Sequence, residues 1–96
     1  MKPRKAHDVR SDLQRKGFRP TQTDHEKWTL YVGVQKTTVH TKISHGQEEC
    51  DGFVLAQMAR QLCLSTQELA DLLDCPLSYE AYVRLLAARK RDFHTA

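Results

Sequence analysis

No run of apolar residues in this sequence of 96 residues approaches the roughly 18 that a helix needs to cross a bilayer. The basic N-terminus also lacks the apolar segment of a signal peptide, because it leads into an amphipathic stretch. Both absences argue against a membrane protein and against secretion. We therefore expect a cytoplasmic protein that does not contact a membrane.

Cysteine is scarce, with single residues at Cys50, Cys63 and Cys75. An odd number at wide spacing excludes a disulfide framework, and the lack of close pairs argues against a zinc ribbon. We expect the three thiols to be reduced and to act as small apolar filler near helix ends. A zinc site formed with His40 or His45 is the alternative.

Several enzyme signatures are also missing from the sequence. It contains no glycine-rich loop that could cradle a phosphate, no HExxH and no Gly-x-Ser-x-Gly. The carboxylates that could gather a magnesium ion are concentrated in the later helical segments, away from the histidines. If the chain is an enzyme, we expect it to work without a metal ion or a cofactor.

Length and composition predict one domain covering residues 1–96, since 40% of the residues are apolar and can form a small core. The net charge is only +3, but it is distributed unevenly. Residues 1–20 hold seven basic and two acidic residues, whereas residues 48–83 hold one basic and seven acidic. This asymmetry favours one face that meets phosphate and another that does not, with ordinary solvated surfaces as the alternative.

The first element is predicted to be a helix over residues 5–16. Ala6, Val9 and Leu13 recur at spacings of three and four, and Gly17 follows as a C-terminal stop. The basic residues of this helix are expected on or near its solvent side, where they could solvate the helix or touch phosphates; they are Lys5, Arg10, Arg15 and Lys16.

Three strands are predicted next. Residues 18–23 form a short edge strand in which the proline is tolerated. In the second strand one face is buried, and its apolar residues alternate with polar ones; they are Trp28, Leu30, Val32 and Val34. After a turn near residues 33–36, Val39, Thr41 and Ile43 mark the buried face of a third, antiparallel strand. The sheet should therefore have one apolar and one polar face.

Helices are predicted for the rest of the chain, after a polar loop over residues 46–50. Asp51 is a plausible N-cap for a helix that covers the sheet. Ser65 and Glu68 have capping-box spacing, and Ser78 caps a fourth helix. The predicted fold is α+β: a helix, a three-stranded antiparallel sheet and a helix, followed by two additional C-terminal helices, with one face of the sheet open.

The candidate site residues lie on the polar face of the sheet, namely His25, Lys27, Tyr31, His40 and Lys42. If the second strand extends back to His25, its ring shares the side of Lys27. A histidine can move protons near neutral pH, and the lysine could stabilise charge on a phosphate. An exposed loop histidine without a role is the alternative.

The other candidates admit more than one interpretation. His45 falls at the end of the third strand, where it could cap the turn or reach the site from its rim. His40, in mid-strand, could be only a cross-strand neighbour of Lys27 or Thr29. Tyr31 could stack on an unpaired base while lysines contact phosphates, which would make the face a binding surface without catalysis.

A family resemblance rests on three motifs: residues 13–18, residues 24–25, and residues 41–46 with the sequence TKISHG. The helix with Leu55, Met58 and Leu62 and the turn that follows it complete the pattern. Over roughly residues 8–74 the chain resembles the HicA-type toxins of bacterial and archaeal toxin–antitoxin pairs.

The resemblance implies a fold like the double-stranded RNA-binding domain, cleavage of mRNA, and neutralisation by a HicB-like antitoxin. The family's catalytic histidine matches His25, which follows Thr23-Asp24 here and a Gly-Ser pair in the family; its second histidine matches His45. Cleavage would use the 2′-hydroxyl of the RNA as nucleophile, with Lys27 or Lys42 stabilising charge. A helical extension over residues 65–92 lengthens the family's compact unit.

Two alternatives to a ribonuclease toxin remain. The chain could be a non-catalytic RNA-binding module of the same fold. It could also be a helix-turn-helix DNA-binding protein, since residues 59–70 have the pattern of two short helices about a turn. The second helix of that motif carries Glu68, Asp71 and Asp74, which the phosphates of DNA would repel.

Overall fold

The structure is a computed structural model that describes residues 2–89. In chain order its elements are β1 (Arg4–Lys5), α1 (Ala6–Arg15), β2 (Phe18–Gln22), β3 (Glu26–Val32), β4 (Gln35–Ile43), β5 (Glu49–Cys50), α2 (Gly52–Gln61), α3 (Thr66–Asp74) and α4 (Tyr79–Arg89). The described residues confirm the predicted fold class, α+β with a three-stranded antiparallel sheet. No helix within the described range is long and apolar enough to span a membrane.

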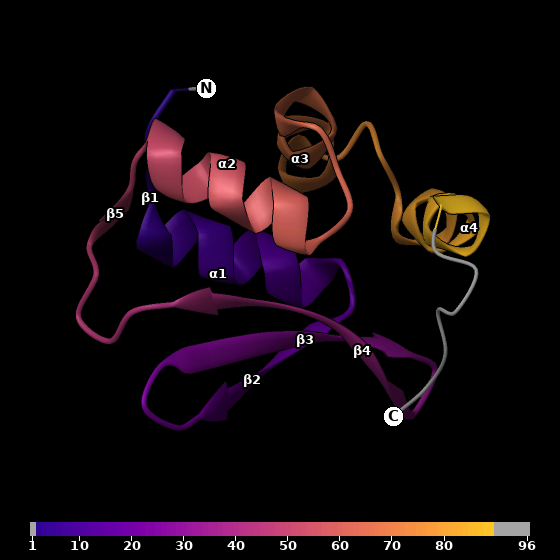
Figure 1. The fold of residues 1–96 in the computed structure, drawn as a ribbon, viewed down its shortest axis with the longest axis horizontal. Coiled ribbons are helices and arrows are strands. Elements are labelled where there is room, and N and C mark those ends of the chain that lie inside the picture. Colours follow the sequence, from indigo (N-terminus) through magenta and orange to yellow (C-terminus); the bar gives the residue numbers. More distant parts are fainter. Residues whose placement is uncertain (1, 90–96) are drawn as a thin grey trace.

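The main sheet has the order β2-β3-β4, with both neighbouring pairs antiparallel. Helices α1 and α2 lie against one side of it, and none of the described elements covers the other side (Figure 1). Side chains alternate accordingly, so that Val39 and Ile43 of β4 are buried while Thr38 and Lys42 are exposed. One apolar and one open face are present, as the period-two pattern predicts.

The turn between β3 and β4 falls earlier than the alternation of apolar residues suggests. β3 ends at Val32, and Gly33 takes a positive φ of 64°, which reverses the chain. Val34 is consequently 87% exposed in this turn. The prediction that Val34 continues the buried face is wrong, because the tight turn removes it from the strand.

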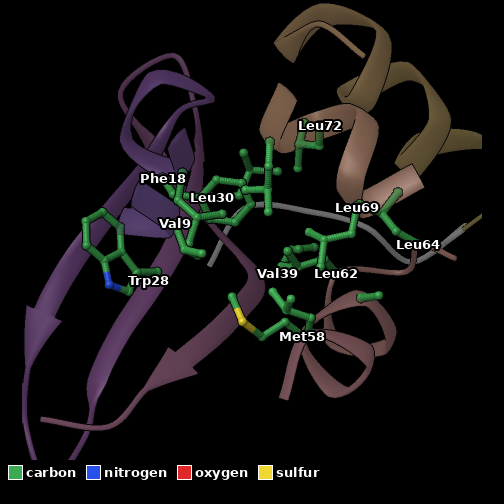
Figure 2. Close-up of a cluster of buried hydrophobic side chains, with 14 of the residues drawn as sticks. Val9, Phe18, Trp28, Leu30, Val39, Met58, Leu62, Leu64, Leu69 and Leu72 are labelled. Carbon is green, nitrogen blue, oxygen red and sulfur yellow. The ribbon is translucent and has the colours of Figure 1, made fainter. Parts of the chain in front are cut away.

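The core lies between the sheet and the helices, and Figure 2 shows its central part. Leu30 and Val39 of the sheet pack there with side chains of α1, α2 and α3, including Val9, Met58, Leu69 and Leu72. α4 joins the same core through Tyr82, whose ring stacks on Phe18 with 6.2 Å between centroids. The two C-terminal helices are thus packed into the hydrophobic core; residues 90–92 of the predicted extension lie outside the described residues.

The predicted helix starts are confirmed by their hydrogen bonds. The side chain of Asp51 accepts from the N–H of Val54, and Ser65 and Glu68 form a reciprocal capping box. The hydroxyl of Ser78 accepts from the N–H of Ala81.

Lys16 departs from the prediction that it lies on or near the solvent side. It is only 7% exposed, and its ammonium group donates to the carbonyl oxygens of Leu72 (2.7 Å) and Leu77 (2.8 Å). Leu72 lies in the last turn of α3, where carbonyl groups have no partner within the helix. Leu77 lies in the loop that follows. Lys16 therefore ties α1 to the α3–α4 connection.

Part of the predicted polar loop before α2 is a short strand. β5 pairs antiparallel with β1, with Arg4 opposite Cys50 and Lys5 opposite Glu49. The chain before α1 is thereby fixed beside the start of α2, a pairing between residues far apart in sequence that local patterns do not indicate.

All three cysteines are free, as predicted. Cys50 is buried and Cys63 is half-buried, in keeping with small apolar filler. Cys75 is exposed at the end of α3, where the guanidinium of Arg15 donates to its sulfur at 3.3 Å. The filler interpretation is therefore wrong for Cys75.

Candidate functional site

The open face of the sheet is the side that α1 and α2 leave uncovered. The strand register places nine side chains on it: Arg19, Thr21, Lys27, Thr29, Tyr31, Lys36, Thr38, His40 and Lys42. Four of the nine carry a fixed positive charge and none is acidic. Such a one-signed surface attracts polyanions.

The cations of the open face are arranged in rows across the strands. Lys27 lies directly opposite Lys42, and Tyr31 lies opposite Lys36. The guanidinium of Arg19 sits over the ring of Tyr31, 4.4 Å from its centroid, in a cation–π contact. The face therefore combines charge with a flat aromatic surface.

Thr29 occupies the middle of the open face and is only 1% exposed. Its register partners are Arg19 on β2 and His40 on β4, and these longer side chains flank the small threonine. Its hydroxyl oxygen is buried without a hydrogen-bond partner in residues 2–89. Sequence parity places Thr29 on this face but does not predict its burial.

His40 is the cross-strand neighbour of Thr29, one of the two positions that the sequence suggests. Its Nδ1 lies 3.0 Å from the carbonyl oxygen of Thr38. A carbonyl oxygen only accepts hydrogen bonds, so Nδ1 carries a hydrogen and Nε2 is the unprotonated nitrogen of the neutral ring.

A hollow of about 440 Å³ lies at one end of the sheet, where β4 ends. His25, Lys42, Ser44 and His45 line it on the strand side, and Gln57 and Gln61 of α2 line it on the other. We call it the two-histidine hollow. It brings together two histidines that are far apart in the sequence.

His45 is held by the turn that contains His25. Its Nε2 lies 2.9 Å from the carbonyl oxygen of Thr23, and the hydroxyl of Thr23 donates to the carbonyl of His25 at 2.9 Å. Nε2 must carry the hydrogen of the first contact, which leaves Nδ1 as the proton-accepting atom of a neutral His45. The side chain of His45 thus links the turn after β4 to the turn before β3, and it lines the hollow.

His25 is exposed in the turn before β3, since this strand begins at Glu26. The second strand does not extend back to His25, so the condition under which its ring would share the side of Lys27 is not met. Of the sequence candidates, Lys27, Tyr31 and His40 lie on the open face, and His25 and His45 line the hollow. Lys42 belongs to both sets.

Glu26, the residue that follows His25, is held by two hydrogen bonds and was not among the sequence candidates. It is 8% exposed, and one carboxylate oxygen accepts from Arg10 Nε at 2.7 Å and from Trp28 Nε1 at 2.6 Å. Charge-assisted bonds of this kind fix a buried carboxylate firmly. The start of β3, and with it the turn of His25, is therefore tied to α1.

The residues of the helix-turn-helix alternative do form two helices about a turn, α2 and α3. Two of the three carboxylates of α3 form ion pairs within the protein, Asp74 with Arg4 and Glu68 with Arg89. Hydrogen bonding to Arg89 lowers the pKa of Glu68 to about 2, and Arg4 lowers the pKa of Asp74. Since both stay negative at neutral pH, α3 is poorly suited to a phosphate-lined groove.

Within residues 2–89, no three histidine, cysteine or acidic side chains come together in a way that could hold a metal ion. Comparison with known proteins finds no matching family model, no similar curated protein and no similar solved structure.

Proposed function

We propose that this protein is an endoribonuclease that cleaves mRNA without a metal ion or cofactor, as its resemblance to HicA-type toxins implies. The observation that carries the proposal is the two-histidine hollow. His25 and His45 line it with Lys42, at the end of a sheet face that has four fixed positive charges and no carboxylate.

The order of elements supports the fold that the resemblance implies. α1, β2, β3, β4 and α2 follow one another, and both helices lie on the same side of the antiparallel sheet. This is the helix–sheet–helix order of a double-stranded RNA-binding domain. In the proposal, α3 and α4 are additions to that unit.

The proposed reaction is an attack by a ribose 2′-oxygen on the adjacent phosphorus. His25 accepts the 2′-hydroxyl proton while the new O2′–P bond forms, and His45 in its protonated state supplies a proton to the departing 5′-oxygen as the P–O5′ bond breaks. Lys42, with Lys27 beside it, stabilises the additional negative charge of the phosphorane. The products are a 2′,3′-cyclic phosphate and a 5′-hydroxyl.

A non-catalytic RNA-binding module is the second candidate, and the open face favours it. Lysines that contact phosphates and a tyrosine on which a base can stack are sufficient to bind a single strand. Binding that weakens steeply with salt, with no cleavage of the RNA, would distinguish this function from the first.

In the cell, the proposed activity makes the chain a cytoplasmic toxin that a HicB-like antitoxin neutralises. Induced expression of the wild type should arrest growth, and coexpression of the neighbouring open reading frame should restore it. His25→Ala should abolish the arrest, whereas His7→Ala, which changes an exposed histidine of α1, should not. Equal arrest by wild type and His25→Ala would contradict the assignment of His25.

A further inference from the structure

A second hollow, of about 870 Å³, lies at the other end of the sheet from the two histidines. It is bounded by the end of α1, by β2, by the β3–β4 turn and by the start of α4, and Gln14, Gly17, Arg19, Tyr31, Tyr79 and Glu80 are among its lining residues. Its volume is within the range of small-molecule sites. We call it the tyrosine hollow; the proposed cleavage reaction does not use it.

One wall of the tyrosine hollow is a fixed aromatic ring. The hydroxyl of Tyr79 donates to the carbonyl oxygen of Tyr31 at 2.9 Å, which ties α4 to the end of β3. The ring passes so close to Gly17 that a Cβ there would lie 2.6 Å from Tyr79 Cε1. Since Gly17 also has a φ of +87°, the site requires glycine at this position.

A cation–π pair forms the other wall. Arg19 is exposed, and its guanidinium covers the half-buried ring of Tyr31. Guanidinium planes and tyrosine rings are the surfaces on which proteins stack unpaired bases. The carboxylate of Glu80 and the amide of Gln14 provide acceptors and donors for the edge of a base.

The open face connects the two hollows. Lys27 and Tyr31 are four residues apart on β3, which corresponds to about 13 Å along a strand. The row of Lys27 and Lys42 lies toward the histidines, and Lys36 lies opposite Tyr31. A strand of nucleic acid laid along β3 would meet cations at both ends.

We propose that the tyrosine hollow binds an unpaired base of a single-stranded RNA whose backbone lies across the open face toward the two-histidine hollow. The proposal rests on the proposed function in taking RNA as the ligand, and it adds a base-binding site at the opposite end of the sheet from the histidines. Bases inside a duplex are stacked on each other and cannot enter such a hollow.

Binding of the full chain to a fluorescent oligouridine, compared with heparin as a polyanion without bases, tests the base site. Tyr31→Leu should weaken oligouridine binding by between about fivefold and about a hundredfold, the range expected for the loss of one stacked base. Its affinity for heparin should be unchanged. Lys36→Gln is the matched control on the same face: it should weaken both ligands and lower the salt dependence of both.

Photocrosslinking locates the base without relying on a variant that folds. Single-stranded RNA that contains 4-thiouridine should crosslink to the peptides of Tyr31 or Tyr79. Crosslinks elsewhere, or equal losses of heparin and oligouridine binding in Tyr31→Leu, would overturn the base site but leave the cleavage proposal intact. Failure to bind any RNA would overturn both, and binding of polyglutamate in place of RNA would indicate an acidic protein partner.

Discussion

Lys27 of β3 and Lys42 of β4 lie directly opposite each other on the open face of the sheet. Like charges at facing positions of an antiparallel pair destabilise it. The arrangement costs stability in the free protein, and it becomes favourable when a polyanion lies across the two ammonium groups. The facing lysines are therefore a specific reason to expect phosphate to bind at this end of the sheet.

Replacing one of these lysines should stabilise the free protein and weaken its binding to RNA. Lys42→Thr should raise the free energy of unfolding by about 0.2–1 kcal/mol, because it relieves the repulsion. The salt dependence of RNA binding should fall by about 0.7 in the logarithmic slope, the contribution of one phosphate contact on a single strand. Lys36→Thr, which faces Tyr31, is the control for strand propensity; an equal gain in stability there would show that repulsion is not the cause.

The buried ammonium of Lys16 should be important for stability. Lys16→Met keeps a long apolar stem but leaves the carbonyls of Leu72 and Leu77 without their donor, at a cost of about 1–3 kcal/mol. Lys5→Met, at the exposed N-cap position before the same helix, should change stability by less than about 0.5 kcal/mol. Urea denaturation of both variants tests this, and a similar small effect at both positions would contradict the structural role.

Gly17 should be less tolerant of substitution than Gly46, although both have a positive φ. Gly46→Ala has open space around the new methyl group, so it should cost only about 1 kcal/mol for the backbone conformation. Gly17→Ala adds a contact with the ring of Tyr79 and should cost clearly more. Repeating both substitutions in Tyr79→Ala should remove the difference between them, and a difference that persists would implicate another contact.

The ion pair between Glu68 and Arg89 predicts a specific acid dependence. The pKa of Glu68 is lowered in the folded protein to about 2 from an ordinary 4.5, so its contribution to stability is complete above about pH 4.5. As pH falls from there to about 2, the carboxylate takes up a proton and the contribution is lost. The melting temperature of Glu68→Gln should therefore lie below that of the wild type at pH 6 and approach it near pH 2. A constant difference across this range would exclude the pairing as its source.

Local sequence patterns were sufficient for the helices, the three main strands and, except at Val34, their buried faces. Alternation and helical spacing report directly on which side of an element is buried, and Asp51 and Ser65 cap their helices through neighbours only three residues away. Some turn conformations escaped prediction. Cys63 and Cys75 adopt positive φ angles of 63° and 88°, where glycine is the usual signal.

Long-range contacts could not be predicted from the same patterns. The neighbouring sequence does not distinguish the buried Lys16 from an exposed lysine, because the carbonyls that accept its hydrogen bonds are more than fifty residues away. His25 and His45 were candidates individually, but the hollow that joins them depends on how two turns and α2 meet. The tyrosine hollow likewise depends on α4 reaching the end of β3.

Cleavage of single-stranded RNA by the purified chain in EDTA, with analysis of the product ends, tests the central claim most directly. The wild type and His7→Ala should produce 2′,3′-cyclic phosphate and 5′-hydroxyl ends. His25→Ala should lose about 10²- to 10⁴-fold in rate, the usual contribution of one acid–base group. Products with 5′-phosphate ends, or a His25→Ala variant as fast as the wild type, would contradict the account.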